Sequence, residues 1–464
     1  MNRSTLIAAL AQPKTYDLAI IGGGATGLGV ALDAAARGFS VVLVESHDFA
    51  KGTSSRATKL VHGGVRYLAQ GNISLVREAL HERSTLLANA PHLAQPLPFV
   101  MPSYRVWEAP FYGIGLKMYD ALAGKAGLGD TEFLNRAETL RYLPNARVDG
   151  PNGQLRGGVK YWDGQFDDAR LALALARSAQ AAGARVLNYA EVTAIRQASG
   201  ETEPVSTLDV TDRRTGARLA LRARCVVNAT GVWVDALRDR TQPAASAQPS
   251  RMVSPSQGVH VVVDRDFMPG GHALLVPRTR DGRVLFAVPW LGKLVLGTTD
   301  TPRKDLPREP DAFAQELDFI LAEAGQALSR PVRREDIRSL WVGLRPLVAP
   351  PEAAEGSTQT LSREHTIVVD PNGLVTVTGG KWTTYRAMAE DVLERCFASQ
   401  ILPRRPPGLS ATHRLIGAGT GGEAPTPLYE PPGLHLYGSE AAEVQKGQGA
   451  GRLLGMGLSE AMVR

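Results

Sequence analysis

Basic and aromatic side chains recur beside glycines at three places in the sequence, and these are the residues best suited to act on an anionic molecule. The segment VHGGVRYL sets Arg66 and Tyr67 next to a glycine pair, GLRPL holds Arg345 between apolar residues, and QGVHVVV begins an apolar run around His260. An arginine in an apolar frame usually has an anionic partner, and an imidazole titrates near neutral pH. Taken singly, each of these residues is better explained as part of a structural salt bridge or as a buried, hydrogen-bonded histidine.

A fourth segment, GGKWTTYR, runs from Gly379 to Arg386 and leads from a predicted strand into a predicted helix. The positive end of that helix, together with Lys381, can face a flavin ring and stabilise the negative charge that reduction creates there. The alternative is an ordinary helix start with Thr383 as its cap. The other nucleotide-binding signals favour the flavin interpretation.

The element that must position these groups is predicted between Asp17 and Glu45, in DLAIIGGGATGLGVALDAAARGFSVVLVE. This stretch has the order strand, glycine turn, helix, strand and acid. Gly22 permits the tight turn, Gly24 lets the backbone approach a pyrophosphate, and Gly27 lets helix and strand pack closely. Glu45 lies about 20 residues on, where a carboxylate binds a ribose hydroxyl. The sequence therefore predicts a dinucleotide-binding unit.

Two further segments extend this unit. Thr53, Ser54 and Ser55 follow the acid and offer hydroxyl and N–H groups to a pyrophosphate. The turn NATG, Asn228–Gly231, follows a second apolar strand. A second small-residue turn of this kind is typical of folds that wrap FAD along its length.

Hydrophobic periodicity predicts the remaining elements. Helices are expected over residues 73–89, 169–182, 311–328 and 383–397, and an irregular segment over 91–110, which is rich in helix breakers. A single strand is expected over 184–195, hairpins over 207–221 and 367–378, and a separate antiparallel sheet over 253–300. Residues 403–432 are rich in Pro and Gly and predict a linker, and residues 439–464 a helical segment.

Composition narrows the class of protein. The chain has 464 residues, a net charge of +6 and two cysteines, Cys225 and Cys396, which are far apart and lack zinc spacing. These features indicate a reducing compartment, no metal centre and no nucleic-acid arm. No run is long and apolar enough to span a bilayer, and no secretory signal is evident. We expect a cytoplasmic protein or one peripheral on the inner face of the cytoplasmic membrane, where Phe111–Leu128 and its lysines could meet anionic lipid.

Together these motifs resemble the FAD-dependent glycerol-3-phosphate dehydrogenases. The resemblance covers about residues 16–400 and includes IGGGATGLG, the TSS loop, KLVHGGVRYL, DDARL, NATGVW, VPW…GTTD, GLRPL and GGKWTTYR. It implies an α/β fold: a Rossmann-like FAD-binding domain with an inserted antiparallel substrate domain and a short C-terminal helical segment. The expected division is 16–104, 155–250 and 341–400 for the FAD-binding domain, 105–154 and 251–340 for the substrate-binding insertions, 401–438 for a linker, and 439–464 for the start of a helical cap.

The resemblance implies oxidation of sn-glycerol 3-phosphate to dihydroxyacetone phosphate, with hydride transfer to flavin N5 and electrons passed to a quinone. Arg66 and Arg345 are then expected to clamp the phosphate or polarise the reacting oxygen, and Tyr67 to orient the substrate. His260 is the first candidate for the base and Lys381 the second. The residues expected to bind FAD are Gly22, Gly24, Ala25, Thr26, Gly27, Glu45, Thr53, Ser54, Ser55, Lys59, Leu60, His62, Gly63, Gly64, Val192, Ala229, Thr230, Gly231, Trp233, Gly380, Lys381, Thr383 and Thr384.

Three alternatives stay open from the sequence. A glycerol-phosphate oxidase would use oxygen as the acceptor at the same site. A related amine or D-amino-acid oxidase would bind a carboxylate in place of the phosphate. An FAD-binding protein inactivated by a shortened cap would bind flavin without turnover. A homo-oligomer is compatible with all of these.

Overall fold

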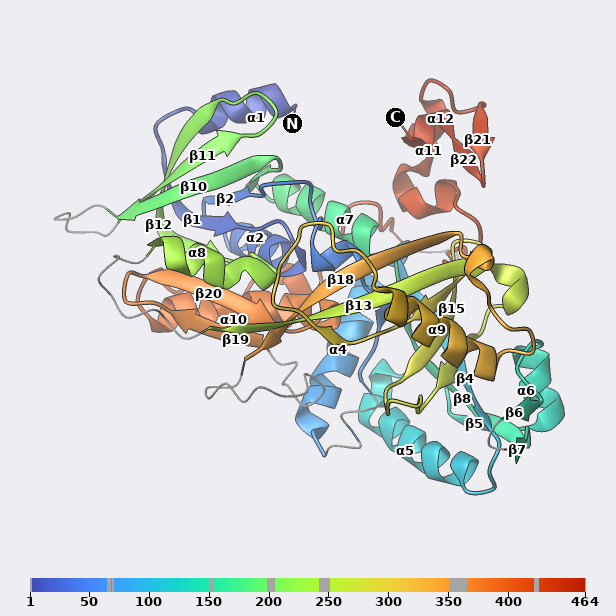
Figure 1. The fold of residues 1–464 in the computed structure, drawn as a ribbon. Helices are drawn as coiled ribbons and strands as arrows, with labels where there is room; N and C mark the ends of the chain where they lie inside the picture. Colours follow the sequence, from blue (N-terminus) through green and yellow to red (C-terminus); the bar gives the residue numbers. More distant parts are fainter. Residues whose placement is uncertain are drawn as a thin grey trace.

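The computed structural model describes residues 2–64, 68, 71–150, 153–197, 205–241, 251–349, 365–420 and 425–463. Two large β-sheets organise the molecule, and Figure 1 shows them side by side with helices around them. Each sheet packs against helices of its own through a separate hydrophobic cluster. The predicted α/β class is confirmed.

The first sheet has eight strands in the order β10-β11-β12-β1-β2-β9, with β20 beside β12 and β19 beside β20. Five of them run parallel, and β10, β11 and β19 are antiparallel to their neighbours. The strands are β1 (Thr15–Ile21), β2 (Val41–Val44), β9 (Arg185–Leu187), β10 (Ala190–Gln197), β11 (Ser206–Asp212), β12 (Arg218–Asn228), β19 (His365–Val369) and β20 (Leu374–Gly379).

Helices cover both faces of this sheet because its strands are apolar on both sides. Leu18 and Ile20 of β1 pack in the cluster that contains α2 (Ala25–Ala36), α7 (Asp168–Ala181) and α10 (Tyr385–Ala398). The alternating residues Ala19 and Ile21 face the other way, in the cluster that contains residues of α1 (Arg3–Leu10) and α8 (Val234–Thr241).

The second sheet has ten strands in the order β17-β13-β16-β15-β14-β4-β8-β3, with β18 beside β13 and β5 beside β8. Its strands are β3 (Leu60–Val61), β4 (Ala94–Ser103), β5 (Glu132–Asn135), β8 (Gly157–Phe166), β13 (Val253–Asp264), β14 (Ala273–Val276), β15 (Leu285–Trp290), β16 (Lys293–Gly297), β17 (Thr301–Pro302) and β18 (Ser339–Val348). The helix α9 (Ala314–Ala327) packs on one face, and α5 (Glu108–Ala123) contacts the other through Leu116.

The strands expected over 253–300 are antiparallel to one another, as predicted, but the expectation for residues 91–110 is wrong. Residues 94–103 are not irregular but form the ten-residue strand β4, which pairs with β8 along its whole length. The prolines that suggested a break lie at alternating positions, Pro96, Pro98 and Pro102, so their missing N–H groups fall on one edge of the strand and the other edge keeps its donors. The sheet is also not purely antiparallel, because β4 and β14 run parallel.

The predicted strand over 184–195 is two strands, β9 and β10, because the chain turns at Tyr189, whose φ is +50°. The C-terminal part of the chain is not simply helical, because a short hairpin separates its helices. The expected linker packs against the body of the protein: Leu415 and Leu428 are buried, and the main chain of Leu291 donates to the carbonyl of Leu428. The division into domains stays a prediction, and the structure places β4, β8 and β18 in the second sheet.

The helices predicted from periodicity are confirmed: α4 (Ile73–Asn89) has the expected bounds, and α7, α9 and α10 begin and end within three residues of theirs. The remaining short elements are α6 (Arg136–Tyr142), α11 (Ala441–Lys446), α12 (Glu460–Val463), β6 (Asp149–Gly150), β7 (Gly153–Gln154), β21 (Leu453–Gly455), β22 (Leu458–Ser459), and the 3-10 turns η1 (Thr53–Ser55), η2 (Gly124–Ala126), η3 (Gly231–Trp233), η4 (Arg265–Phe267), η5 (Arg334–Asp336), η7 (Trp382–Thr384), η8 (Leu409–Ala411) and η9 (Leu434–Glu440).

Candidate functional site

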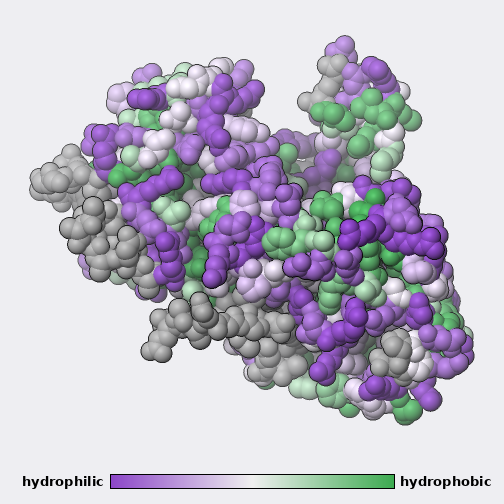
Figure 2. All heavy atoms as spheres, in the orientation of Figure 1, coloured by the Kyte–Doolittle hydropathy of each residue, from purple (hydrophilic) through white to green (hydrophobic). Residues whose placement is uncertain are grey.

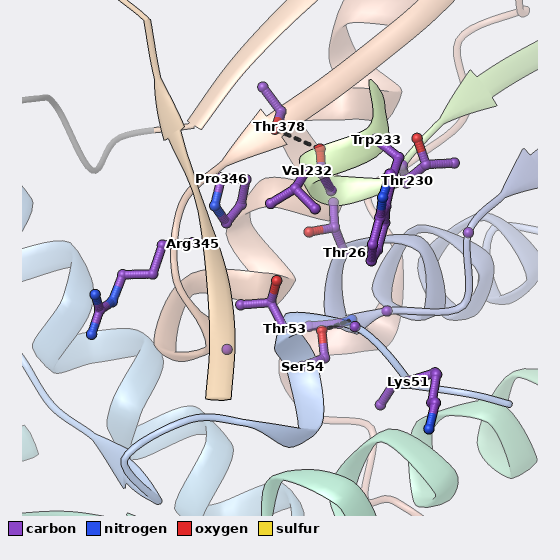
Figure 3. Close-up of a pocket in the computed structure, with 18 of the residues that line it drawn as sticks. Thr26, Lys51, Thr53, Ser54, Thr230, Val232, Trp233, Arg345, Pro346 and Thr378 are labelled. Carbon is purple, nitrogen blue, oxygen red and sulfur yellow. Dashed lines mark hydrogen bonds between the residues drawn. The ribbon is translucent and has the colours of Figure 1, made fainter. Parts of the chain in front are cut away.

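A long cleft of about 2400 Å³, counted with its open mouth, runs between the two sheets. One end is lined by the glycine turn after β1 and by Glu45 at the end of β2. The other end is lined by His260 of β13 and Arg345 of β18. In Figure 3 Arg345 lies on one side of the pocket, and Trp233, Thr230 and Thr26 lie on the other. The cleft therefore joins a nucleotide-type site in the first sheet to charged residues in the second.

The glycine turn has the shape that the sequence predicts. Gly22 has a φ of +112°, and a Cβ there would lie 2.5 Å from the carbonyl oxygen of Ala229. A Cβ at Gly27 would lie 2.0 Å from the carbonyl oxygen of Gly22. Both positions therefore exclude any side chain if the strand, the helix and the second turn are to pack as they do. Gly24 differs: its φ is −85°, and a Cβ would meet only the Ser54 Oγ, at 3.1 Å.

Oxygen atoms already gather at the positive end of α2. The Ser54 Oγ accepts a hydrogen bond from the Ala25 N–H at 3.0 Å. The Glu45 carboxylate accepts from the Gly23 N–H at 2.7 Å and from the His47 N–H at 2.8 Å. A helix N-terminus with such donors is a binding site for phosphate, and Glu45 borders it where a ribose hydroxyl would lie.

The second turn follows β12. Asn228 is fully buried; its side-chain amide donates to the Val234 carbonyl at 2.9 Å, and its oxygen accepts from the Thr230 hydroxyl at 2.7 Å. The Thr378 hydroxyl donates to the Gly231 carbonyl at 3.3 Å, as the dashed line in Figure 3 marks. These bonds hold the turn against β20 and leave its backbone beside the cleft.

The segment after β20 lines the middle of the cleft. Gly379 and Gly380 both have positive φ, at +82° and +73°, and lead through Lys381 into η7 and the start of α10. The Trp382 indole donates to the Ser54 carbonyl at 2.8 Å, so this turn also holds the TSS loop in place. The Thr383 Oγ1 accepts from the His62 N–H at 3.2 Å. The segment that leads into α10 therefore lines the cleft, and the contact of its helix end with a flavin ring stays a prediction.

His260 lies at the far end of the cleft and is 2% exposed. Its Nε2 is 2.9 Å from the Thr58 Oγ1, and its ring stacks on Trp341 with 5.4 Å between the ring centroids. Burial holds the pKa of the imidazole well below its usual value, and the charges of Arg345 and Lys59 lower the pKa further. The ring is therefore neutral at pH 7 and able to accept a proton.

Arg345 reaches from β18 across Gly258 of the neighbouring strand. Its Nη2 donates to the Thr298 Oγ1 at 3.0 Å, and its Nη1 lies 3.3 Å from the Asp300 Oδ1. Asp300 also accepts from the Ser256 hydroxyl, which fixes the carboxylate. The guanidinium lies at the cleft, held by Thr298 and Asp300, and a planar fork of this kind is the geometry that binds phosphate or carboxylate.

The structure brings most of the predicted site residues to this one cleft. Those that line it are Gly22, Gly24, Ala25, Thr26, Glu45, Thr53, Ser54, Leu60, His62, Val192, Ala229, Thr230, Gly231, Trp233, His260, Arg345, Gly380, Lys381 and Thr383. Gly27 packs beneath the turn, and Ser55, Gly63, Gly64 and Thr384 lie next to lining residues without lining the cleft themselves. Arg66 and Tyr67 lie outside the described residues.

Lys59 is placed away from the cleft. It is 4% exposed, its Nζ donates to Asp168 at 2.5 Å, and it lies over the rings of Trp290 and Trp341. The amine of Lys59 is held by Asp168 and is not turned toward a ligand. It lies over the ring of Trp341, which in turn stacks on His260. Lys59 is therefore not among the predicted cofactor-binding residues that line the cleft.

Sequence reasoning missed three residues that shape the site. Thr58 holds His260, Asp300 holds Arg345, and Arg308 lines the cleft. Asp300 belongs to the GTTD motif, and Thr58 immediately precedes the KLVHGG motif. For both residues a neighbouring motif could have indicated a role in the site. Arg308 has none, because it belongs to a loop that carries no motif of its own.

These features fit an extended dinucleotide that carries a flavin. The glycine turn and α2 suit its diphosphate, Glu45 its ribose, and the turn from Gly379 to Lys381 its ring. His260 and Arg345 line the same cleft as that turn.

Comparisons with known proteins agree with this interpretation. The model of the family described as FAD dependent oxidoreductase matches residues 17–392. A mitochondrial glycerol-3-phosphate dehydrogenase of Macaca fascicularis is 41% identical over 472 residues, covering 96% of this chain and 63% of the relative. The mitochondrial glycerol-3-phosphate dehydrogenase SDP6 of Arabidopsis thaliana is 42% identical over 436 residues, covering 92% of this chain and 67% of the relative.

Among solved structures, the glycerol-3-phosphate dehydrogenase from Bacillus halodurans complexed with FAD is similar, with a TM-score of 0.71 and 33% identity. The match covers 90% of this chain and 71% of that one. The present chain spans less than two thirds of the length of the mammalian relatives.

Proposed function

This chain belongs to the FAD-dependent glycerol-3-phosphate dehydrogenases, and we propose that it oxidises sn-glycerol 3-phosphate to dihydroxyacetone phosphate and passes the electrons to a quinone. The observation that carries the proposal is the single cleft that joins two nucleotide-binding turns to His260 and Arg345. FAD, when bound, supplies a hydride acceptor for the C2–H of the substrate.

Arg345 is the residue proposed to bind the phosphate. Its guanidinium is fixed by Thr298 and Asp300 and offers a fork that matches phosphate oxygens. The phosphate is remote from the reacting carbon, so its binding energy can be used to orient C2. Arg66 is proposed to share this task.

His260 is the residue proposed to take the proton from the C2 hydroxyl. Its ring is neutral, and the hydrogen bond to Thr58 together with the stack on Trp341 fixes its orientation. Burial is the larger cause of the low imidazole pKa, and a substrate phosphate near Arg345 would offset only the smaller part that comes from the charge of Arg345. Lys381 remains the second candidate, and Tyr67 is proposed to orient the substrate.

Anaerobic reduction tests the proposal directly. The purified protein reconstituted with FAD should lose its visible flavin absorbance within seconds of adding glycerol 3-phosphate, whereas glycerol should act at least 100-fold more slowly because it lacks the phosphate handle. A quinone analogue should then restore the absorbance without peroxide. Reoxidation by air with stoichiometric peroxide, and no response to the quinone, would identify a glycerol-phosphate oxidase. A flavin that stays oxidised after glycerol 3-phosphate is added would refute the proposed activity.

We also propose that the protein associates with the surface of an anionic membrane. The described residues contain no helix long and apolar enough to cross a bilayer. However, α5 and the residue before it expose Trp107, Phe111, Ile114 and Met118 on one helical face, with Lys117 close by. Figure 2 shows hydrophobic atoms at the lower edge of the molecule, the region of α5 in Figure 1. An exposed apolar stripe beside lysines suits an interface helix.

Sedimentation with liposomes checks this surface. The protein should pellet with vesicles that contain anionic lipid at low salt and be released at high salt, because screening weakens the lysine contacts. Replacing Phe111 and Ile114 by Ser should abolish pelleting. The matched double variant Leu453→Ser/Leu454→Ser removes two exposed leucines elsewhere and should leave pelleting intact. Wild-type protein that stays in the supernatant at both salt concentrations would overturn the proposal.

A further inference from the structure

The segment Thr301–Asp311, called the strap below, crosses from the second sheet to the nucleotide end of the cleft. It begins at β17 and ends before α9, and Figure 1 shows the gold chain that leads into α9 looping toward the part of the molecule that contains α2. Its root is held in the second sheet by Arg303, which donates to the Gln257 Oε1 at 2.5 Å and to Asp305 at 2.7 Å. Beyond this root the strap leaves its own sheet.

One side of the strap contacts the loop that follows the glycine unit. The carboxylate of Glu309 pairs with Arg56 at 2.6 Å and also with Lys51. Both basic residues line the cleft, next to Thr53 and Ser54. The strap is therefore attached to the wall of the cleft that carries the TSS loop.

The other side of the strap contacts the second nucleotide turn. The Trp233 indole donates to the Leu306 carbonyl at 3.2 Å, and the Arg308 guanidinium lies 3.7 Å from the centroid of the Trp233 ring. Arg308 lines the cleft, as do Glu45 and Arg240. Partial desolvation lowers the pKa of Arg308, while the carboxylates of Glu45 and Glu191 act in the opposite direction. A stacked guanidinium thus faces the end of the cleft where Glu45 lies.

We propose that Arg308 is a further binding residue for the adenosine diphosphate half of FAD, and that the strap which carries it closes this end of the cleft. The inference rests on the proposed function, since it assumes that FAD occupies the cleft. A guanidinium that is already stacked on Trp233 loses little freedom when it pairs with a diphosphate, and its charge complements that of the phosphates. Because the strap bridges both walls, FAD cannot leave this end of the cleft until the strap detaches.

The fastening of the strap is weak and sensitive to salt. Glu309 is 63% exposed at its side chain and Lys51 is 42% exposed, whereas Arg56 is 12% exposed. Ion pairs with so exposed a carboxylate contribute little and are screened by salt. The strap can therefore open without unfolding the sheet at its root. The release of FAD should accelerate with ionic strength in the wild-type protein.

Measurement of FAD binding tests this inference. Apoprotein variants are titrated with FAD by fluorescence, and release is timed after dilution into an excess of a flavin scavenger. Arg308→Ala should weaken FAD binding about 10-fold, and Arg308→Lys should recover part of the loss because it keeps the charge. Glu309→Gln should speed release about 5-fold and remove most of its salt dependence. The affinity for FMN, which lacks the adenosine part, should be unchanged in all of them.

Asp318→Asn is the matched control, because the Arg334–Asp318 pair is also exposed and 2.6 Å long but lies away from the cleft. It should bind and release FAD as the wild type does. Arg308 and Glu309 are exposed, so circular dichroism should show unchanged folding for every variant. Binding and release of FAD within twofold of wild type in Arg308→Ala and Glu309→Gln would overturn the role of the strap and leave the proposed function standing. A wild-type protein that binds no FAD would overturn both.

Discussion

Replacing Arg345 by alanine should lower kcat/KM for glycerol 3-phosphate by about 30- to 1000-fold, equivalent to about 2–4 kcal/mol of transition-state stabilisation. The substitution removes the fork of donors that faces the cleft, so the substrate phosphate loses its charged partner there. Steady-state kinetics with a dye as electron acceptor measures the change. Activity on glycerol should fall much less, because glycerol has no phosphate to lose a partner.

The conservative variant Arg345→Lys separates charge from geometry. It keeps the positive charge but not the planar fork, so it should lie between wild type and Arg345→Ala. Asp300 has a side chain that is only 6% exposed and would lose its partner in the alanine variant, so melting temperatures must accompany the kinetics. Equal losses on glycerol and glycerol 3-phosphate would assign Arg345 to the reacting oxygen instead of the phosphate.

Replacing Gly24 by valine should abolish the binding of FAD, with a loss of affinity of at least about 100-fold, or about 2.8 kcal/mol. The backbone of Gly24 has an ordinary φ of −85°, and a Cβ there meets only the Ser54 hydroxyl, which can rotate aside. The protein should therefore fold, while the branched side chain fills the space that a diphosphate needs at the start of α2. Absorbance of the purified protein and titration of the apoprotein with FAD measure the effect.

Two other glycine variants serve as comparisons for Gly24→Val. Gly115→Val changes a helical glycine of α5 that has no heavy atom near the position of a Cβ, and it should retain FAD. Gly22→Val should fail at the earlier step of folding, because that backbone has a φ of +112° and the side chain would strike Ala229. A folded Gly24→Val protein that is yellow and binds FAD like the wild type would show that the diphosphate does not lie at this turn.

Much of the cofactor-binding half of the fold was predictable because its signals are local. The ends of β2 and α4 and the start of α7 agree with the periodicity to within a residue, since alternation and helix caps depend on neighbouring residues.

Local signals also led to a wrong prediction, at the strand β4. Each proline of β4, taken alone, indicates a break. Their even spacing, of two and then four residues, puts the missing N–H groups on one edge and, together with the pairing to β8, makes them compatible with a sheet.

The sequence by itself determined where the backbone must be glycine and where a dinucleotide can bind. Those requirements arise from steric contacts within a few residues, as at Gly22 and Gly27. Only the tertiary structure decided which side chains meet across the cleft. The pairing of Asp300 with Arg345 depends on the register of β13 with β18, and the pairing of Thr58 with His260 joins residues 202 positions apart in the sequence. The position of Arg308 over Trp233 depends in turn on how the two sheets lie together, which no short segment of the chain encodes.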